Sequence, residues 1–239
     1  MQLTIKHPFL CLPVVSHPKD TRVLKLFDGE KLLLCVYFPF GEAAADNGTY
    51  SYEYLSPLPV SEWMGRTLTL SAEFPAGFED AVTQTDELPV SGEVHPAVHF
   101  TANAGWINDP NGLVYDNGTY HLYYQHNPFG VNWNNMSWGH ATSTDLLHWT
   151  RLPVAMLPDE EGTIFSGCGL TNEHRDEIQA AADSNLYRSL PKDALLFFYT
   201  AAGGSHDSAC SEGKDYTQHT AYSTDHGLTL QKLPGAVVP

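Results

Sequence analysis

The sequence is poor in basic residues, in long apolar runs and in recognisable targeting segments. Lysine and arginine number 12 against 28 aspartates and glutamates, which gives a formal net charge of −16. An acidic surface repels nucleic acid and anionic membranes, so neither is expected as a partner. No run approaches the roughly 20 apolar residues of a membrane span. Pro8 and Pro13 interrupt the apolar start of the chain, so no signal peptide is visible and a cytoplasmic location is expected.

Cysteine is also scarce. The four cysteines are Cys11, Cys35, Cys168 and Cys210, and they form neither a CxxC pair nor a close cysteine–histidine spacing. The 12 histidines are scattered and contain no HExxH motif. We therefore expect no metal, no cofactor and no disulfide framework, and we interpret the cysteines as buried or free thiols.

Short β-branched and aromatic segments separated by turn residues dominate the first part of the chain, which predicts strands. They span residues 22–27, 31–38, 49–55 and 66–74, with turns expected at 28–30 and at two copies of Asp-Asn-Gly-Thr-Tyr, 46–50 and 116–120. Residues 76–98 lose this alternation and gain proline, glycine and acidic residues, as a linker does. We predict an N-terminal β-sandwich over residues 1–92.

The remaining chain repeats a plan of about four short strands twice, and each set contains a Ser-Thr-Asp tripeptide, at 143–145 and 223–225. Four-stranded units with a shared motif are typical of β-propeller blades. One helical pattern, residues 175–190, interrupts the second set and is interpreted as a surface insertion. The predicted fold is all-β, with residues 93–239 forming part of a propeller.

The segment Trp106–Gly112, WINDPNG, places Asp109 where a strand is expected to break into a tight turn. Such a carboxylate is rigidly held and open to a cleft, as a catalytic acid needs to be. The alternative is that Asp109 only caps the turn. Further blocks follow in order along the chain: YYQHNPF at 123–129, WGHATSTDLLHW at 138–149, LPDEEGTIFSG at 157–167 and AYSTDHGLT at 221–229.

Together these blocks resemble glycoside hydrolase family 32, the invertases, inulinases and levanases, over residues 99–239. The resemblance implies a retaining β-fructosidase in which Asp109 is the nucleophile. The resemblance also implies that a set of polar and aromatic residues binds the substrate: Trp106, Asn108, Gln125, Trp133, Phe165 and Ser166. Their amides suit the hydroxyls of a furanose, and their indole rings suit its apolar face.

Other interpretations remain open for several of these positions. Phe165 would also suit core packing, and His126 and His140 are better explained as hydrogen-bonded histidines on inner strands than as acid or base groups. The run from Asp159 to Glu161 is interpreted as a solvated loop or a structural cap.

The sequence departs from the family at its end. The family's second carboxylate lies in an Arg-Asp-Pro motif and its acid/base in a Glu-Cys motif, and neither motif occurs in the 239 residues. We therefore expect about two of five blades and an incomplete, inactive β-fructofuranosidase unless another chain supplies the missing groups. The alternatives are a non-catalytic fructose- or fructan-binding remnant and a structural module. The expected partners are a fructose-containing saccharide and a second chain, identical or complementing, that covers the open flank.

Overall fold

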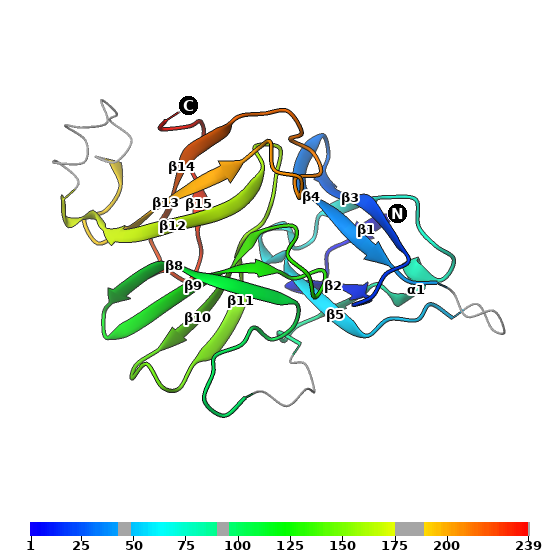
Figure 1. The fold of residues 1–239 in the computed structure, drawn as a ribbon, viewed down its shortest axis with the longest axis horizontal. Coiled ribbons are helices and arrows are strands. Elements are labelled where there is room, and N and C mark those ends of the chain that lie inside the picture. Colours follow the sequence, from blue (N-terminus) through cyan, green and yellow to red (C-terminus); the bar gives the residue numbers. More distant parts are fainter. Residues whose placement is uncertain (43–48, 90–95, 175–188, 239) are drawn as a thin grey trace.

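The computed structural model describes residues 1–42, 49–89, 96–174 and 189–238, in which four antiparallel sheets account for most of the regular structure (Figure 1). The helices of this part are one short α-helix, α1 (Phe78–Ala81), and two 3₁₀ turns, η1 (Ser61–Trp63) and η2 (Asn172–His174). The prediction of an all-β chain is confirmed. No helix of the described segments is long and apolar enough to cross a membrane.

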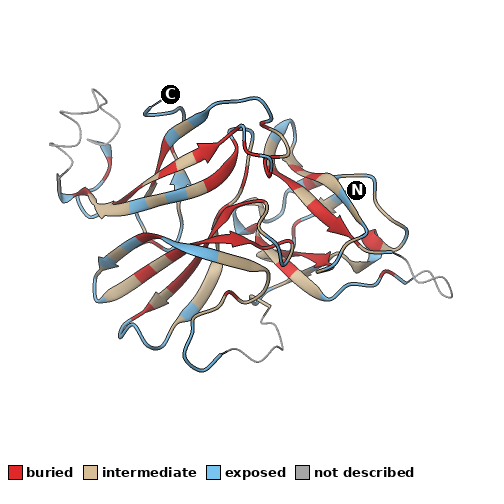
Figure 2. Ribbon diagram, viewed as in Figure 1, coloured by how far each residue is buried: buried red, intermediate tan, exposed pale blue. Residues whose placement is uncertain are grey.

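The N-terminal part contains two sheets that share one core. One has the order β1 (Gln2–Thr4), β6 (Thr67–Ser71), β3 (Asp20–Asp28), β4 (Lys31–Phe40), and the other has the order β5 (Tyr54–Pro59), β2 (Phe9–Val14), β7 (Thr83–Thr85). Strands β3 and β4 are joined at Gly29, which has a φ of 59° that glycine adopts without strain. Leu12, Leu24, Phe38 and Phe78 come from both sheets and from α1, and all are fully buried (Figure 2).

Part of the segment predicted as a linker belongs to this N-terminal fold. Phe78 of α1 contacts the rings of Phe38, Phe40 and Tyr50, and β7 pairs with β2. The linker prediction is therefore wrong for residues 78–85. The acidic and polar residues of this stretch lie on its exposed side, and they obscured the single aromatic anchor in the sequence pattern.

The other two sheets are meanders of four consecutive strands in a propeller-like arrangement. The first contains β8 (Trp106–Asp116), β9 (Thr119–Asn127), β10 (Ser137–Ser143) and β11 (Thr150–Met156), and the second contains β12 (Thr163–Thr171), β13 (Leu195–Ala202), β14 (Tyr216–Ser223) and β15 (Gln231–Lys232). Their first strands, β8 and β12, lie side by side (Figure 1). Buried Tyr123, Trp138 and Phe197 fill the space between the two sheets.

The repeated sequence motifs form repeated turns. Ser143 donates a hydrogen bond to Asp145 after the third strand of the first sheet, and Ser223 donates to Asp225 at the same place in the second. Each turn then contains a left-handed residue, Leu146 or His226. The second Asp-Asn-Gly-Thr-Tyr copy forms the predicted hairpin, with positive φ at Asn117 and Gly118. The first copy and the predicted helical insertion lie largely outside the described residues.

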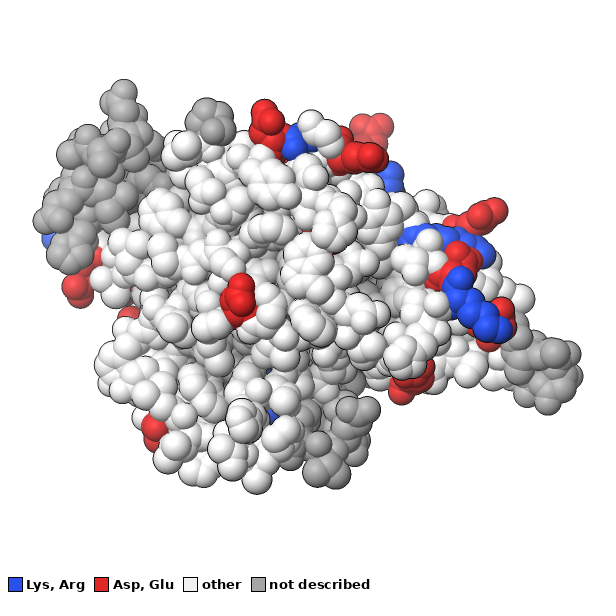
Figure 3. All heavy atoms as spheres, in the orientation of Figure 1, with Lys and Arg blue, Asp and Glu red and all other residues white. Residues whose placement is uncertain are grey.

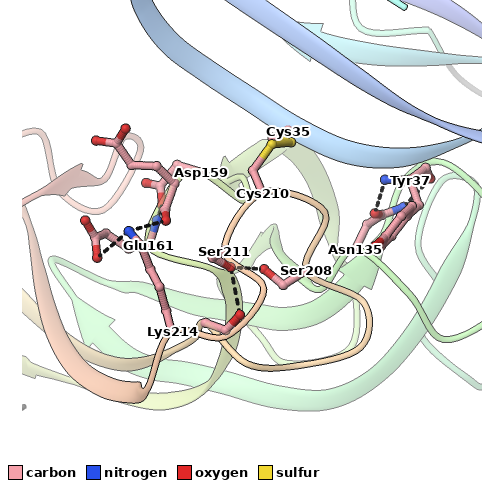
Figure 4. The surroundings of a disulfide bond; sticks show 11 residues. Cys35, Tyr37, Asn135, Asp159, Glu161, Ser208, Cys210, Ser211 and Lys214 are labelled. Atoms are coloured by element: carbon pink, nitrogen blue, oxygen red, sulfur yellow. Dashed lines mark hydrogen bonds and ion pairs between the residues drawn. A yellow bond between two sulfur atoms is a disulfide. The ribbon is translucent and has the colours of Figure 1, made fainter.

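A disulfide between Cys35 and Cys210 joins β4 to the loop that connects β13 with β14 (Figure 4). The expectation of no disulfide is therefore wrong, because the two cysteines are separated by 175 residues and only the docking of the loop onto β4 brings them together. Cys11 is a buried free thiol and Cys168 an exposed one.

Beside the disulfide, Asn135 contacts the same strand through its side chain (Figure 4). The amide oxygen of Asn135 accepts a hydrogen bond from Tyr37 N at 2.9 Å, and its amide nitrogen donates to Tyr37 O at 2.8 Å. Asn135 is buried and has a φ of 45°, a left-handed conformation that asparagine tolerates. One side chain therefore satisfies both backbone groups of a residue in β4.

Candidate active site

Asp109 lies in an irregular part of strand β8. The pairing of β8 with β9 shifts register between Ile107 and Pro110 and again between Asn111 and Val114. The predicted tight turn is thus a pair of bulges within a continuous strand, which is where sheets often redirect a functional side chain. The carboxylate of Asp109 is exposed.

Strand β12 carries a matching irregularity opposite Asp109. Its register against β13 shifts between Ile164 and Gly167, which leaves Phe165 and Ser166 out of the regular ladder. The Ser166 hydroxyl donates to Asp109 Oδ2 at 3.4 Å, and the next amide, Gly167 N, donates to Asn111 Oδ1 at 3.3 Å. Two bulges on neighbouring strands therefore join the carboxylate to a hydroxyl.

Two groups of aromatic residues lie on or next to the segments that carry this contact. The indole Nε1 of Trp106 donates to Asn108 Oδ1 at 2.9 Å. The ring of Trp133 lies 6.0 Å from that of Phe165 and 5.0 Å from that of His206. Phe165 is half-buried and also contacts Tyr216 at 5.9 Å. Phe165 therefore packs against other rings and still presents part of its surface.

Gln125 is hydrogen-bonded to the irregular part of β12. Its side chain is 2% exposed, and Nε2 donates to Ile164 O at 2.9 Å. Trp138 Nε1 donates to the adjacent carbonyl, Phe165 O, at 3.1 Å. These two bonds hold the backbone that presents Phe165 and Ser166. The structure therefore brings Asp109 to Ser166, Trp133 to Phe165 and Gln125 to strand β12. Trp106 and Asn108 lie three positions and one position before Asp109 in β8.

Residues that the sequence analysis did not single out complete the neighbourhood. Asn111 is 1% exposed, and its Nδ2 has no hydrogen-bond partner in the described structure. Its position in the same WINDPNG segment was the available signal. His206 comes from the loop between β13 and β14, which nothing in the sequence connects with Trp133.

Asp207 anchors that loop. Its carboxylate is 2% exposed and accepts hydrogen bonds from Met136 N at 3.0 Å and from Thr163 Oγ1 at 3.2 Å. The loop is thereby attached to the segment before β10 and to the first residue of β12, as well as to β4 through the disulfide.

The three acidic residues of the 157–167 block are not part of this group. Burial alone would raise the pKa of Asp159, but Lys232, at 2.6 Å, and the Glu161 amide lower it below its ordinary value. Glu160 and Glu161 are exposed. The interpretation of Asp159 as a structural residue is confirmed.

His126 and His140 are buried, hydrogen-bonded strand residues, as predicted. His126 Nδ1 contacts Trp106 O at 2.9 Å, and His140 Nε2 contacts His121 Nδ1 at 3.1 Å. Burial lowers the pKa of His126 to about 4 and, together with the nearby His121, that of His140 to about 3. Both imidazoles are therefore neutral at neutral pH.

These two histidines make the fold sensitive to acid. Because their pKa values are lowered in the folded state, the unfolded chain binds more protons below pH 6.5, and stability is lost as the pH falls from there toward 4. Each histidine is expected to remove about 2 kcal/mol between pH 7 and 5. In urea titrations over this range, His140→Gln should reduce the pH slope by up to about 1.4 kcal/mol per pH unit. An unchanged slope in a folded variant would contradict this.

The described residues contain no group of three or more histidine, cysteine, aspartate or glutamate side chains arranged to hold a metal ion. Lysine, arginine, aspartate and glutamate are sparse on the broad face shown in Figure 3, where uncharged side chains cover most of the surface over the β8 and β12 sheets. A neutral, hydroxyl-rich ligand suits such a surface better than an ion does.

Two propeller-like sheets of an all-β domain thus place the exposed carboxylate of Asp109 beside the hydroxyl of Ser166. The family model described as "Glycosyl hydrolases family 32 N-terminal domain" matches residues 99–239. The chain belongs to glycosyl hydrolase family 32.

Individual relatives share this part of the chain. A levanase of Bacillus subtilis is 38% identical over 174 residues, which cover 72% of this chain and 22% of the levanase. An extracellular exo-inulinase of Aspergillus niger is 41% identical over 155 residues, 59% of this chain and 27% of the inulinase. The chain thus spans about a quarter of the length of these relatives. A β-fructofuranosidase structure from Schwanniomyces occidentalis, complexed with fructosyl-erythritol, shares 33% identity with a TM-score of 0.47, over 59% of this chain and 26% of that one.

Proposed function

We propose that this chain supplies the fructosyl-binding and nucleophile part of a β-fructofuranosidase that hydrolyses sucrose or fructans. The observation that carries the proposal is the exposed Asp109 carboxylate, held 3.4 Å from Ser166 where the bulges of β8 and β12 face each other. Levanase and exo-inulinase relatives support the choice of a β-fructoside as substrate.

Asp109 attacks the anomeric carbon of the fructosyl unit and forms a covalent glycosyl-enzyme while the glycosidic bond breaks, with its electron pair leaving on the glycosidic oxygen. Water then hydrolyses the glycosyl-enzyme, which releases fructose and regenerates the carboxylate. The Ser166 hydroxyl orients the carboxylate. Trp106 and Trp133 cover the apolar face of the ring, and Asn108 offers its amide to the sugar hydroxyls. Gln125 uses its amide nitrogen to hold β12, which leaves its amide oxygen as an acceptor.

In this proposal residues 1–92 are a β-sandwich, and residues 93–239 are the first two blades of a five-bladed propeller. The carboxylates that stabilise the transition state and protonate the leaving oxygen come from another stretch of polypeptide. The absence of Arg-Asp-Pro and Glu-Cys from the 239 residues supports this division.

Fructose titrations followed by tryptophan fluorescence test the binding half of the proposal. Fructose should produce a saturable change that glucose does not, because the amides are placed for a furanose. Trp133→Phe should weaken fructose binding by roughly five- to tenfold through loss of indole contact, about 1 kcal/mol. Trp63→Phe, a change in the N-terminal part, is the matched control. A response that is equal for both sugars or unaffected by Trp133→Phe would contradict the proposal.

We expect a second copy of the chain to cover the exposed flank of the second propeller-like sheet. Tyr216, the first residue of β14, and Val238, which forms an isolated bridge with Gln218 of the same strand, are 52% and 56% exposed, and apolar surface of this kind marks contact sites. A protein made of residues 1–239 should therefore form a two-fold homodimer at micromolar concentration, measured by light scattering coupled to size exclusion. A single monomeric species over the whole concentration range would count against this expectation.

A further inference from the structure

A cavity lies at the junction of the N-terminal sheets and the first propeller-like sheet, apart from Asp109. Its volume is about 40 Å³, room for roughly three water molecules or for the polar end of a small ligand. Strand β5 forms one wall, β9 to β11 form the other, and residues 88, 103 and 104 close one side. Strands β5 and β11 contact each other there (Figure 1).

Ser56 of β5 is a polar residue that lines this junction cavity. The residue is 1% exposed, and its Oγ has no hydrogen-bond partner in the described structure. Buried polar groups are nearly always hydrogen-bonded, so an orphan hydroxyl in a cavity wall indicates a missing partner. A hydroxyl can both donate to and accept from that partner.

His126 contributes an acceptor. Its Nδ1 must carry the proton, because the carbonyl oxygen of Trp106, 2.9 Å away, can only accept a hydrogen bond. Since burial keeps the imidazole neutral by lowering its pKa to about 4, Nε2 has a lone pair. The occupant therefore needs an O–H or N–H group.

Arg151 contributes the charge. Its Nε donates to Thr101 O at 2.7 Å, its Nη2 lies 3.4 Å from Thr101 Oγ1, and the guanidinium lies over the ring of Phe100. Within the described segments Arg151 forms no ion pair, and the cavity lining contains no aspartate or glutamate. The guanidinium has further N–H donors beyond these two bonds.

The Nε2 atom of His126, which needs a hydrogen-bond donor, and the guanidinium of Arg151, which needs an acceptor, together restrict which ligand can bind. A fully ionised anion would satisfy Arg151 but repel the His126 lone pair, and the net charge of −16 disfavours it further. A hydroxyl group satisfies both, since it donates to His126 and accepts from Arg151. Pro57, Leu88 and Val154 supply apolar contact for carbon–hydrogen groups between hydroxyls.

We propose that the junction cavity is a second sugar site that binds two neighbouring hydroxyls of a neutral saccharide, separate from the site at Asp109. The choice of a fructose-containing saccharide as the ligand rests on the proposed function, whereas the hydroxyl chemistry rests on the cavity itself.

Nitrogen-15 NMR of the histidine side chains measures the chemical shift of His126 Nε2 and so detects binding at this cavity. In a titration of the 239-residue protein with 1-kestose, the His126 Nε2 resonance should move and saturate, with a dissociation constant on the order of millimolar. Inorganic sulfate, a fully ionised anion without an O–H donor, should leave it unmoved. The same titration in Trp133→Phe should give an unchanged His126 response, because that variant alters only the site at Asp109.

Two cavity variants complete the test. Ala104→Leu narrows the cavity and should weaken the His126 response at least tenfold. Ser56→Ala, which leaves the packing intact, should weaken it severalfold. A saturating shift with sulfate, no shift with 1-kestose, or a shift that survives both cavity variants would overturn the proposal. Failure of the proposed function alone would look different: tryptophan fluorescence would not respond to fructose while the His126 shift remained.

Discussion

A protein made of residues 1–239 alone is expected to leave sucrose, inulin and levan intact. In the proposed function Asp109 is the nucleophile, but the leaving oxygen needs a proton from an acid on the opposite side of the sugar. Positioned general acid catalysis contributes roughly 10²–10⁴-fold, about 3–5 kcal/mol of barrier. Asp159 does not replace this acid, because Lys232 forms an ion pair with its carboxylate.

The decisive experiment supplies the missing groups in trans. A second polypeptide carrying the Arg-Asp-Pro and Glu-Cys segments of a family relative, added to residues 1–239, should restore release of reducing sugar. Asp109→Asn should abolish that release, and Asp116→Asn, the same substitution on the same strand, should not. Hydrolysis by residues 1–239 alone that disappears in Asp109→Asn would contradict the expectation. It would mean that an acid within these residues, or across a dimer interface, completes the site.

Loss of the disulfide is expected to have the second-largest effect. Cys35 and Cys210 close a loop of 175 residues, for which the chain-entropy model gives about 5 kcal/mol of stabilisation. The folded state should also loosen locally, because the bond ties the β13–β14 loop to β4. Cys35→Ser should therefore lower the free energy of unfolding by several kcal/mol in guanidinium titrations.

Cys168→Ser is the matched control, since Cys168 is a free and exposed thiol. A reducing agent should lower the stability of the wild-type protein to that of Cys35→Ser and leave the variant unchanged. Equal stability of the wild-type protein with and without reductant would rule out a stabilising role for this bond.

The sequence predicted those parts of the fold whose signals are local. Strand β6 alternates clearly, β3 and β4 are rich in strand-forming residues on either side of a turn signal, and the Asn117–Gly118 hairpin follows from its turn residues. Strand β2 was missed because Pro13 and the continuous apolar run around it do not read as a regular strand. Strand β7 was missed because it has only three residues and lies in an acidic segment.

The site shows the same division. Asp109 and Ser166 lie in recognisable motifs. Their hydrogen bond depends on the irregularities of β8 and β12, which the motifs do not predict. The contributions of His206, Asp207 and the Cys35–Cys210 pair depend on where one long loop docks. Such long-range contacts leave no periodic trace in a single sequence.

The bonds between Asn135 and Tyr37 have a consequence for solubility. Strand β4 ends its sheet, so its outer backbone groups would be free to recruit a strand from another molecule and to start aggregation. The Asn135 amide pairs with the backbone N–H and C=O of Tyr37 on that outer edge, in the way that a residue of a neighbouring strand would. The covalent bond at Cys35, two residues away, keeps a loop over the same edge. The propeller-like part therefore occupies outward-facing backbone groups of β4 and leaves fewer of them free to pair with another copy of the chain.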